Sequence, residues 1–111
     1  MMVPAFNSSL RRVKFAPNKP MVIDMKFSLG RVVCTIGAHA DFSMVEMILC
    51  LNRHMNGDWG DLSEDDKEEN ELAIEFGDRI LSSYKFPDGR VLWLITEADR
   101  SVTTILRPKD Y

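Results

Sequence analysis

Two cysteines and two histidines are the side chains of this 111-residue chain that are best suited to bind a transition metal. Cys50 and His54 are four residues apart and share one face of a predicted helix, and Cys34 and His39 could complete a zinc site. However, no Cys-x-x-Cys pair is present, and a cysteine in a strand or an apolar helix is usually a small buried hydrophobe. We therefore predict no metal and no cofactor.

Sequence signs of nucleophilic catalysis are also weak. The chain contains neither a Gly-x-Ser-x-Gly elbow nor a Walker-type glycine-rich loop. Glu97 and Asp99 precede Arg100 in a predicted turn, where they form either a carboxylate–guanidinium binding cluster or a solvated hairpin tip. We favour a non-enzymatic protein and treat these three residues as candidate binding residues.

A short predicted helix, from Ser63 to about Phe76, holds the densest charge. It carries seven carboxylates and only one base, Lys67, and the carboxylates are Glu64, Asp65, Asp66, Glu68, Glu69, Glu71 and Glu75. Like charges four residues apart destabilise a helix, so this composition suits a solvated face or a surface that meets a basic partner. Mimicry of DNA phosphates is one form of the second hypothesis. The candidate binding residues here are Glu64, Asp65, Asp66, Glu68 and Glu69.

Trp59 lies in the loop before the acidic helix, between Gly57 and Gly60. Glycines permit the backbone angles that would fold the indole back onto the core, and we predict that Trp59 packs there. The alternative is an exposed recognition aromatic, and on that ground Trp59 also counts as a candidate binding residue.

Periodicity and turn signals predict the elements that position these residues. A β-branched run over 26–36 indicates a strand with a bend at Gly30, and Asp41 as N-cap indicates a helix over 42–55. Ser63 and Gly77 delimit the acidic helix. Alternating or apolar runs predict three further strands over 80–86, 91–95 and 102–106. The predicted fold is α+β, in the order βααβββ, with an antiparallel meander packed against a helix pair.

The helix over 42–55 is apolar around most of its circumference, so it should be buried or lie at an interface. The alternatives for covering that surface are residues 1–24, a protein partner, or a second copy in a two-fold homodimer, which we favour. Met47→Lys should separate such a dimer without unfolding the monomer only if that helix face lies at the interface. Residues 1–24 contain three prolines and no sustained period, which predicts an extension before a single domain over 25–111.

Several short motifs point to a family. Gly57-Asp58-Trp59-Gly60-Asp61-Leu62 and Glu69-Asn70-Glu71-Leu72 are followed by Thr96-Glu97-Ala98-Asp99-Arg100-Ser101, Thr103-Thr104-Ile105-Leu106 and Asp110-Tyr111. Over about 27–111 the chain resembles a small uncharacterised protein family of bacterial plasmids and phages, whose members are labelled plasmid-related or restriction–modification associated. The resemblance implies a mobile-element context and no catalytic residues.

A second hypothesis comes from the order of the elements, which resembles that of the RelE/ParE toxin superfamily. That resemblance implies a metal-independent ribonuclease with basic and aromatic side chains on its sheet. The residues that would form such a surface are Arg79, Tyr84, Lys85, Arg90, Arg100 and Arg107.

Overall charge argues against direct nucleic-acid binding. The net charge is −3 and the pI is near 5.3, whereas nucleic-acid-binding domains are usually basic. Charge is uneven: residues 41–78 hold twelve acids and two bases, a net of −10. With no apolar run long enough to span a membrane and no disulfide framework, we expect a cytoplasmic protein that binds a protein partner.

Overall fold

The computed structural model describes residues 25–111, so the predicted N-terminal extension lies outside the described residues. Its elements are β1 (Arg31–Cys34), α1 (Ile36–Asp41), α2 (Met44–Met55), α3 (Glu64–Phe76), β2 (Ile80–Lys85), β3 (Val91–Thr96), β4 (Val102–Leu106) and the 3-10 helix η2 (Pro108–Asp110). The predicted α+β class is confirmed.

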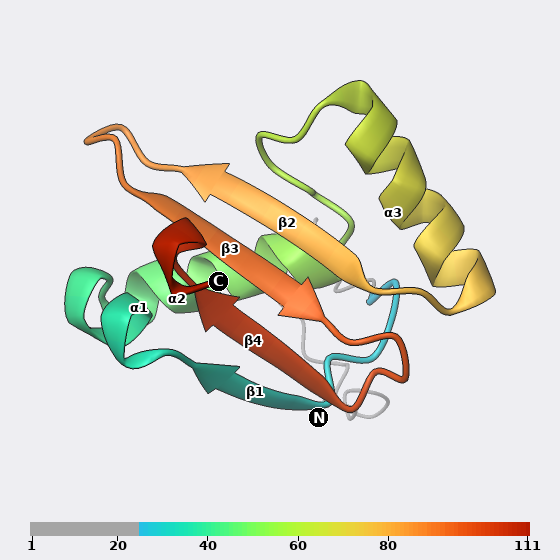
Figure 1. Ribbon diagram of the computed structural model, residues 1–111, viewed down its shortest axis with the longest axis horizontal. Helices are drawn as coiled ribbons and strands as arrows, with labels where there is room; N and C mark the ends of the chain where they lie inside the picture. Colours follow the sequence, from blue (N-terminus) through green and yellow to red (C-terminus); the bar gives the residue numbers. More distant parts are fainter. Residues whose placement is uncertain (1–24) are drawn as a thin grey trace, which may run out of the picture.

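The four strands form one mixed sheet in the order β1-β4-β3-β2 (Figure 1). β2, β3 and β4 are the predicted antiparallel meander. β1 runs parallel to β4, with Arg31 opposite Val102 and Cys34 opposite Ile105. Parallel neighbours need a long connection, and the one between β1 and β4 contains the three helices as well as β2 and β3.

The first strand is shorter than the predicted strand over 26–36. Gly30 has a φ of 65°, which bends the chain just before β1. Thr35 ends the strand because its hydroxyl accepts a hydrogen bond from the Ala38 N–H (3.0 Å) and so begins α1. The residue pattern over 26–36 does not predict α1.

The predicted start of the next helix is also wrong by two residues. Ser43, not Asp41, is the N-cap of α2: its hydroxyl accepts from the Glu46 N–H (3.1 Å), and the Glu46 carboxylate accepts from the Ser43 N–H (2.9 Å). This reciprocal capping box satisfies two backbone donors, whereas Asp41 belongs to α1.

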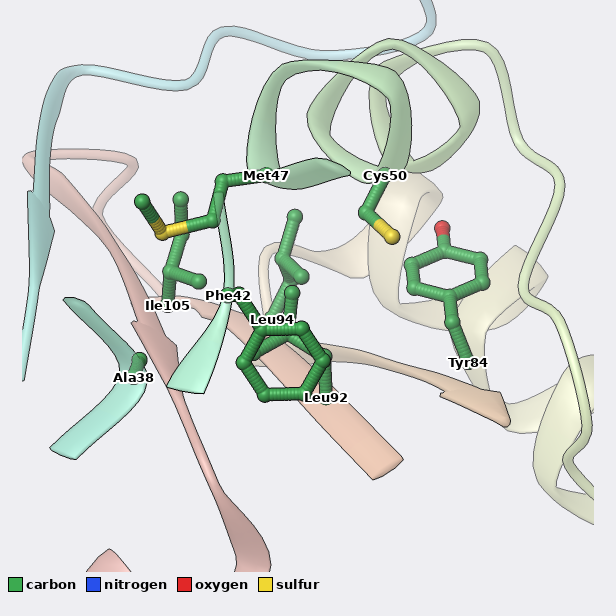
Figure 2. Packing of buried hydrophobic residues seen from close by; sticks show 8 residues of the cluster. All are labelled: Ala38, Phe42, Met47, Cys50, Tyr84, Leu92, Leu94 and Ile105. Atoms are coloured by element: carbon green, nitrogen blue, oxygen red, sulfur yellow. The ribbon is translucent and has the colours of Figure 1, made fainter. Parts of the chain in front are cut away.

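The hydrophobic core lies between α2 and one face of the sheet. Figure 2 shows Met47 and Cys50 projecting from α2 toward Leu94, Ile105 and Tyr84. Burying side chains of this size contributes about 1.5–3 kcal/mol each. A second cluster joins the loop before α3 to the rest of the chain, and its buried members are Phe27, Trp59, Ala73 and Ile80.

The apolar helix predicted over 42–55 is buried on one side only. Met47, Cys50 and His54 face the sheet, while Met44, Val45, Ile48 and Leu49 are exposed. Met47 is a core residue, so a lysine at this position should unfold the monomer. Met47→Lys therefore cannot separate a dimer into folded monomers.

On the opposite face of the sheet, the C-terminus covers part of the central strand. The Tyr111 ring meets Trp93 edge to face, with centroids 6.0 Å apart. Arg79 donates to the Tyr111 hydroxyl (3.3 Å) and pairs with Glu97 (3.2 Å). These contacts hold the end of the chain against β3.

Candidate functional site

The acidic helix α3 lies beside β2, at one edge of the sheet (Figure 1). The Asn70 side chain donates to the Leu81 carbonyl (2.7 Å) and accepts from the Leu81 N–H (3.1 Å). The loop before α3 continues this pairing, since the Ser83 N–H donates to the Trp59 carbonyl and the Asp61 N–H donates to the Ser83 carbonyl. The outer edge of β2 is thus closed, which protects it from pairing with other chains.

The five predicted acidic candidates are all exposed on α3. They are Glu64, Asp65, Asp66, Glu68 and Glu69. Ser63 begins the helix by accepting from the Asp66 N–H (3.1 Å), and the carboxylates of its first turn lie at the positive end of the helix dipole. An ion pair of 3.4 Å joins Lys67 to Glu64. The structure therefore brings these five residues together on one solvent-facing element.

The acidic helix also carries two exposed apolar side chains. Leu72 is 47% exposed and Phe76 is 70% exposed. They are four residues apart and so share a face, next to Glu68, Glu69 and Glu75. In the sequence, this shared face is indicated by the spacing of four residues between Leu72 and Phe76. The outer face of α3 thus combines carboxylates with an apolar pair.

Trp59, another binding candidate, is buried with 4% exposure, which confirms the packing prediction. Its ring stacks on Phe27 with centroids 6.0 Å apart, and its indole N–H donates to the Glu71 carboxylate (2.8 Å). The ring is therefore not a recognition aromatic on the surface. Its contact with Glu71 instead attaches α3 to the core.

The three turn candidates do not form a carboxylate–guanidinium cluster. Arg100, in the left-handed region with a φ of 62°, donates to backbone carbonyls, among them Ala73 (2.8 Å) and Asp78 (2.6 Å). Glu97 pairs with Arg79, and hydrogen bonds from Ser101 lower the pKa of Asp99. Arg100 is thus a structural clamp between the β3–β4 turn and the end of α3.

The basic residues of the ribonuclease hypothesis are largely engaged with carboxylates or carbonyls. Arg90 pairs with Glu46 (2.8 Å) and its hydrogen bonds lower the pKa of that carboxyl to about 2. Arg107 pairs with Asp41 (2.9 Å) and with Asp110 (2.7 Å).

The aromatic residue of the ribonuclease hypothesis, Tyr84, does not lie on an open face of the sheet. Tyr84 lies on the buried helix side of the sheet and donates to the Asp58 carbonyl (2.6 Å). Arg90 and Arg107 also line a surface hollow of about 280 Å³, but the carboxylate of Asp41 lines it with them. These contacts give the ribonuclease alternative no support.

A network of buried polar side chains, which was not predicted, crosses the core. Thr103 donates to the Leu29 carbonyl (2.7 Å), and Thr103 and Thr96 share a hydrogen bond of 2.7 Å. His54 then bonds Thr96 through Nε2 (2.9 Å) and Ser82 through Nδ1 (2.5 Å). All four side chains are fully buried, so the Ser82–His54 pair has no access for a substrate.

Each threonine hydroxyl has one hydrogen to donate, which fixes the direction of the threonine hydrogen bonds in this network. Thr103 gives its hydrogen to the backbone, so Thr96 must donate to Thr103 and accept from the His54 Nε2–H. The number of hydrogens does not fix the charge of His54, but burial does, because it lowers the pKa of this imidazole to about 3. The neutral ring carries its hydrogen on Nε2, so its Nδ1 accepts from Ser82.

The possible zinc ligands do not assemble. Both nitrogens of His54 are used within the core, Cys50 is buried, and Cys34 is exposed on β1. Within residues 25–111 no group of three or more His, Cys, Asp or Glu side chains is placed to hold a metal ion.

Comparison of the chain with protein-family models, with curated proteins and with solved structures finds no match in any of the three. Over the same described range, no helix has both the length and the apolar character needed to cross a bilayer.

Proposed function

We propose that this chain is a non-enzymatic binding protein and that the outer face of α3 docks a protein partner with a basic rim around an apolar pocket. The observation that carries the proposal is the exposure of Leu72 and Phe76 among the carboxylates of α3. Exposed carboxylates steer a basic partner and raise the association rate. A buried aromatic anchor supplies most of the affinity at interfaces of this kind.

The attachment of α3 supports this use. Asn70 joins the helix to β2, Glu71 joins it to Trp59, and Arg100 joins its C-terminal end to the β3–β4 turn. A helix held at three points loses little conformational entropy when it binds. The surface is therefore preorganised.

The apolar pair favours a partner with an apolar pocket over a DNA-binding protein that would be deceived by phosphate mimicry. A mimic of DNA phosphates needs only carboxylates, and an exposed phenylalanine would add nothing to it. The resemblance to proteins of plasmids and phages supports a proposed role as an accessory protein of mobile elements. The free thiols of Cys34 and Cys50 suit the reducing cytoplasm.

Site-specific photo-crosslinking in bacterial cells tests the proposal. A benzoyl-phenylalanine at position 76 should capture a partner of defined mass. The same probe at Lys85, which is exposed at the other end of β2, should not capture it. Equal capture at both positions would contradict a docking site on α3.

The purified partner then separates charge from apolar contact. Phe76→Ala should weaken binding roughly thirtyfold, or about 2 kcal/mol. Glu68→Lys with Glu69→Lys should slow association and reduce its salt dependence. If charge reversal abolishes binding while Phe76→Ala has no effect, the mimicry hypothesis replaces this one.

A further inference from the structure

The two edges of the sheet differ in the pairing of their outward backbone groups. Asn70 and the loop before α3 close the outer edge of β2, whereas β1 forms the other edge. The Arg31 N–H donates to the Ser101 carbonyl, just before β4, and the Thr35 N–H donates to the Ile105 carbonyl in β4. Both N–H groups therefore point inward. The alternate residues Val32 and Cys34 therefore direct their N–H and C=O groups outward, where no residue of the sheet as described here pairs with them.

An exposed apolar flank of α2 lies on the same side of the molecule. Glu46 and Arg53 form the opposite flank, because they pair with Arg90 and Asp58 beside β3 and β2. At 100° per residue, Met44 and Ile48 lie across the helix from these two, on the flank toward β1.

Further exposed apolar residues continue this surface. Ile48 is 54% exposed, and Val45, which lies one turn before it on the helix, is also exposed. Val32 on β1 is opposite the buried Thr103 and so points to the helix side, where it is 41% exposed. The open strand edge and the apolar flank therefore adjoin.

We propose that a second copy of this chain occupies the surface, by antiparallel pairing of β1 with β1 about a two-fold axis normal to the sheet. The second copy supplies what the surface lacks: an unpaired edge strand and a matching apolar flank. Antiparallel addition keeps the helices of both copies on one side of the sheet, so the two apolar flanks face the same groove. An exposed edge strand is otherwise a site of aggregation.

The outward groups fix the register. Pairing Val33 with Val33 of the other copy places each Val32 opposite Cys34, so that both residues use their outward N–H and C=O groups. Arg31 then lies opposite Thr35, and like charges do not meet. The result is an eight-stranded sheet whose outermost strands, the two copies of β2, lie about 34 Å apart at ~4.8 Å per strand, with one α3 helix beyond each of them.

Disulfide trapping in the full chain tests this register. In a Cys34→Ser background, Val33→Cys should form a covalent dimer on mild oxidation, because paired residues on the axis have Cα atoms about 4.5 Å apart. Val32→Cys in the same background is the matched control and should stay monomeric. Cys50 does not interfere, since burial raises the pKa of its thiol to about 11. Equal trapping of both variants would overturn the register.

Sedimentation of the wild-type chain at tens of micromolar tests the association itself. The expected mass is twice 12.7 kDa, and a single species of 12.7 kDa would overturn the proposal. Val32→Pro removes an outward donor and no bond to β4, so it should give a folded monomer, as should Ile48→Lys. If Val32→Pro also unfolds the chain, Ile48→Lys and the trapping pair still decide the matter, and a dimer that survives Ile48→Lys contradicts it.

Discussion

Asn70 is paired with Leu81 through two hydrogen bonds, as a neighbouring strand would be: its amide donates to the Leu81 carbonyl and accepts from the Leu81 N–H. An asparagine side chain carries one donor and one acceptor group in a plane, which matches the main chain of an edge strand. A single side chain on α3 thus continues the hydrogen bonding of the sheet.

This relationship predicts the effect of removing the amide. Asn70→Ala should destabilise the fold by about 2–4 kcal/mol, because the part-buried N–H and C=O groups of Leu81 both lose their partner. Asn70→Asp should be destabilising as well, since a carboxylate cannot donate to the Leu81 carbonyl. Urea denaturation measures both. The neighbouring exposed Glu69→Ala is the control and should change stability by less than about 0.5 kcal/mol.

Trp59 should show separable contributions from its ring and its N–H. Trp59→Ala should cost about 3–5 kcal/mol through the loss of packing on Phe27 and the cavity that remains. Trp59→Phe keeps much of the ring but cannot donate to Glu71, so thermal unfolding should show a smaller loss. A melting temperature that is unchanged in Trp59→Ala would contradict the buried position of the indole.

Arg100 should not tolerate lysine. Its planar guanidinium donates to the carbonyls of Ala73 and Asp78 at once, and a lysine ammonium cannot reproduce that fork. Arg100→Lys should therefore lower the melting temperature, at a cost of about 1–3 kcal/mol. Arg100→Gly is the informative comparison, because it relieves the left-handed backbone but loses every bond. If the glycine variant is as stable as wild type, the clamp contributes little.

His54 should make stability fall in mildly acidic solution. Its pKa is near 6.5 in the unfolded chain and about 3 in the folded one, so between these values only the unfolded chain gains the proton. The contribution is complete above pH 6.5 and is lost as the pH falls toward 3. The full shift corresponds to about 5 kcal/mol at 1.36 kcal/mol per pH unit.

Denaturation at a series of pH values isolates this contribution from the carboxylates. His54→Gln should be less stable than wild type at pH 7 and should lose less stability between pH 6.5 and 3. His39→Gln, a change at an exposed histidine, serves as the control and should follow the wild-type curve. Parallel curves for wild type and His54→Gln would contradict a buried neutral imidazole.

The second half of the fold could be predicted because its signals are local. Pro87-Asp88-Gly89 marks the β2–β3 turn, and Ser63 and Gly77 cap α3 at the two predicted ends. In the first half, the sequence holds two competing N-cap signals, because Asp41 lies two residues before the Ser43–Glu46 capping box that begins α2. α1 is a six-residue helix whose cap, Thr35, stands within an apparently continuous strand.

The acidic face of α3 followed from composition, whereas the contacts that hold it did not. Asn70 pairs with a residue eleven positions away, and His54 with residues 28 and 42 positions away. Such partners depend on which strands become neighbours, and a single sequence does not give that order. Trp59 was predictable as a packing residue because the flanking glycines are a local signal.

The parallel pairing of β1 with β4 has a consequence for synthesis on the ribosome. β1 is among the first elements to emerge, yet its partner strand is the last, with Arg31 opposite Val102. The Thr35 hydroxyl likewise donates a hydrogen bond to the carboxylate of Asp110, which is synthesised 75 residues later. The strands of the meander are all synthesised after β1, so β1 stays unpaired until β4 has been made. Synthesis of β4 and Asp110, rather than of β1 and the helices, therefore sets when this sheet is completed.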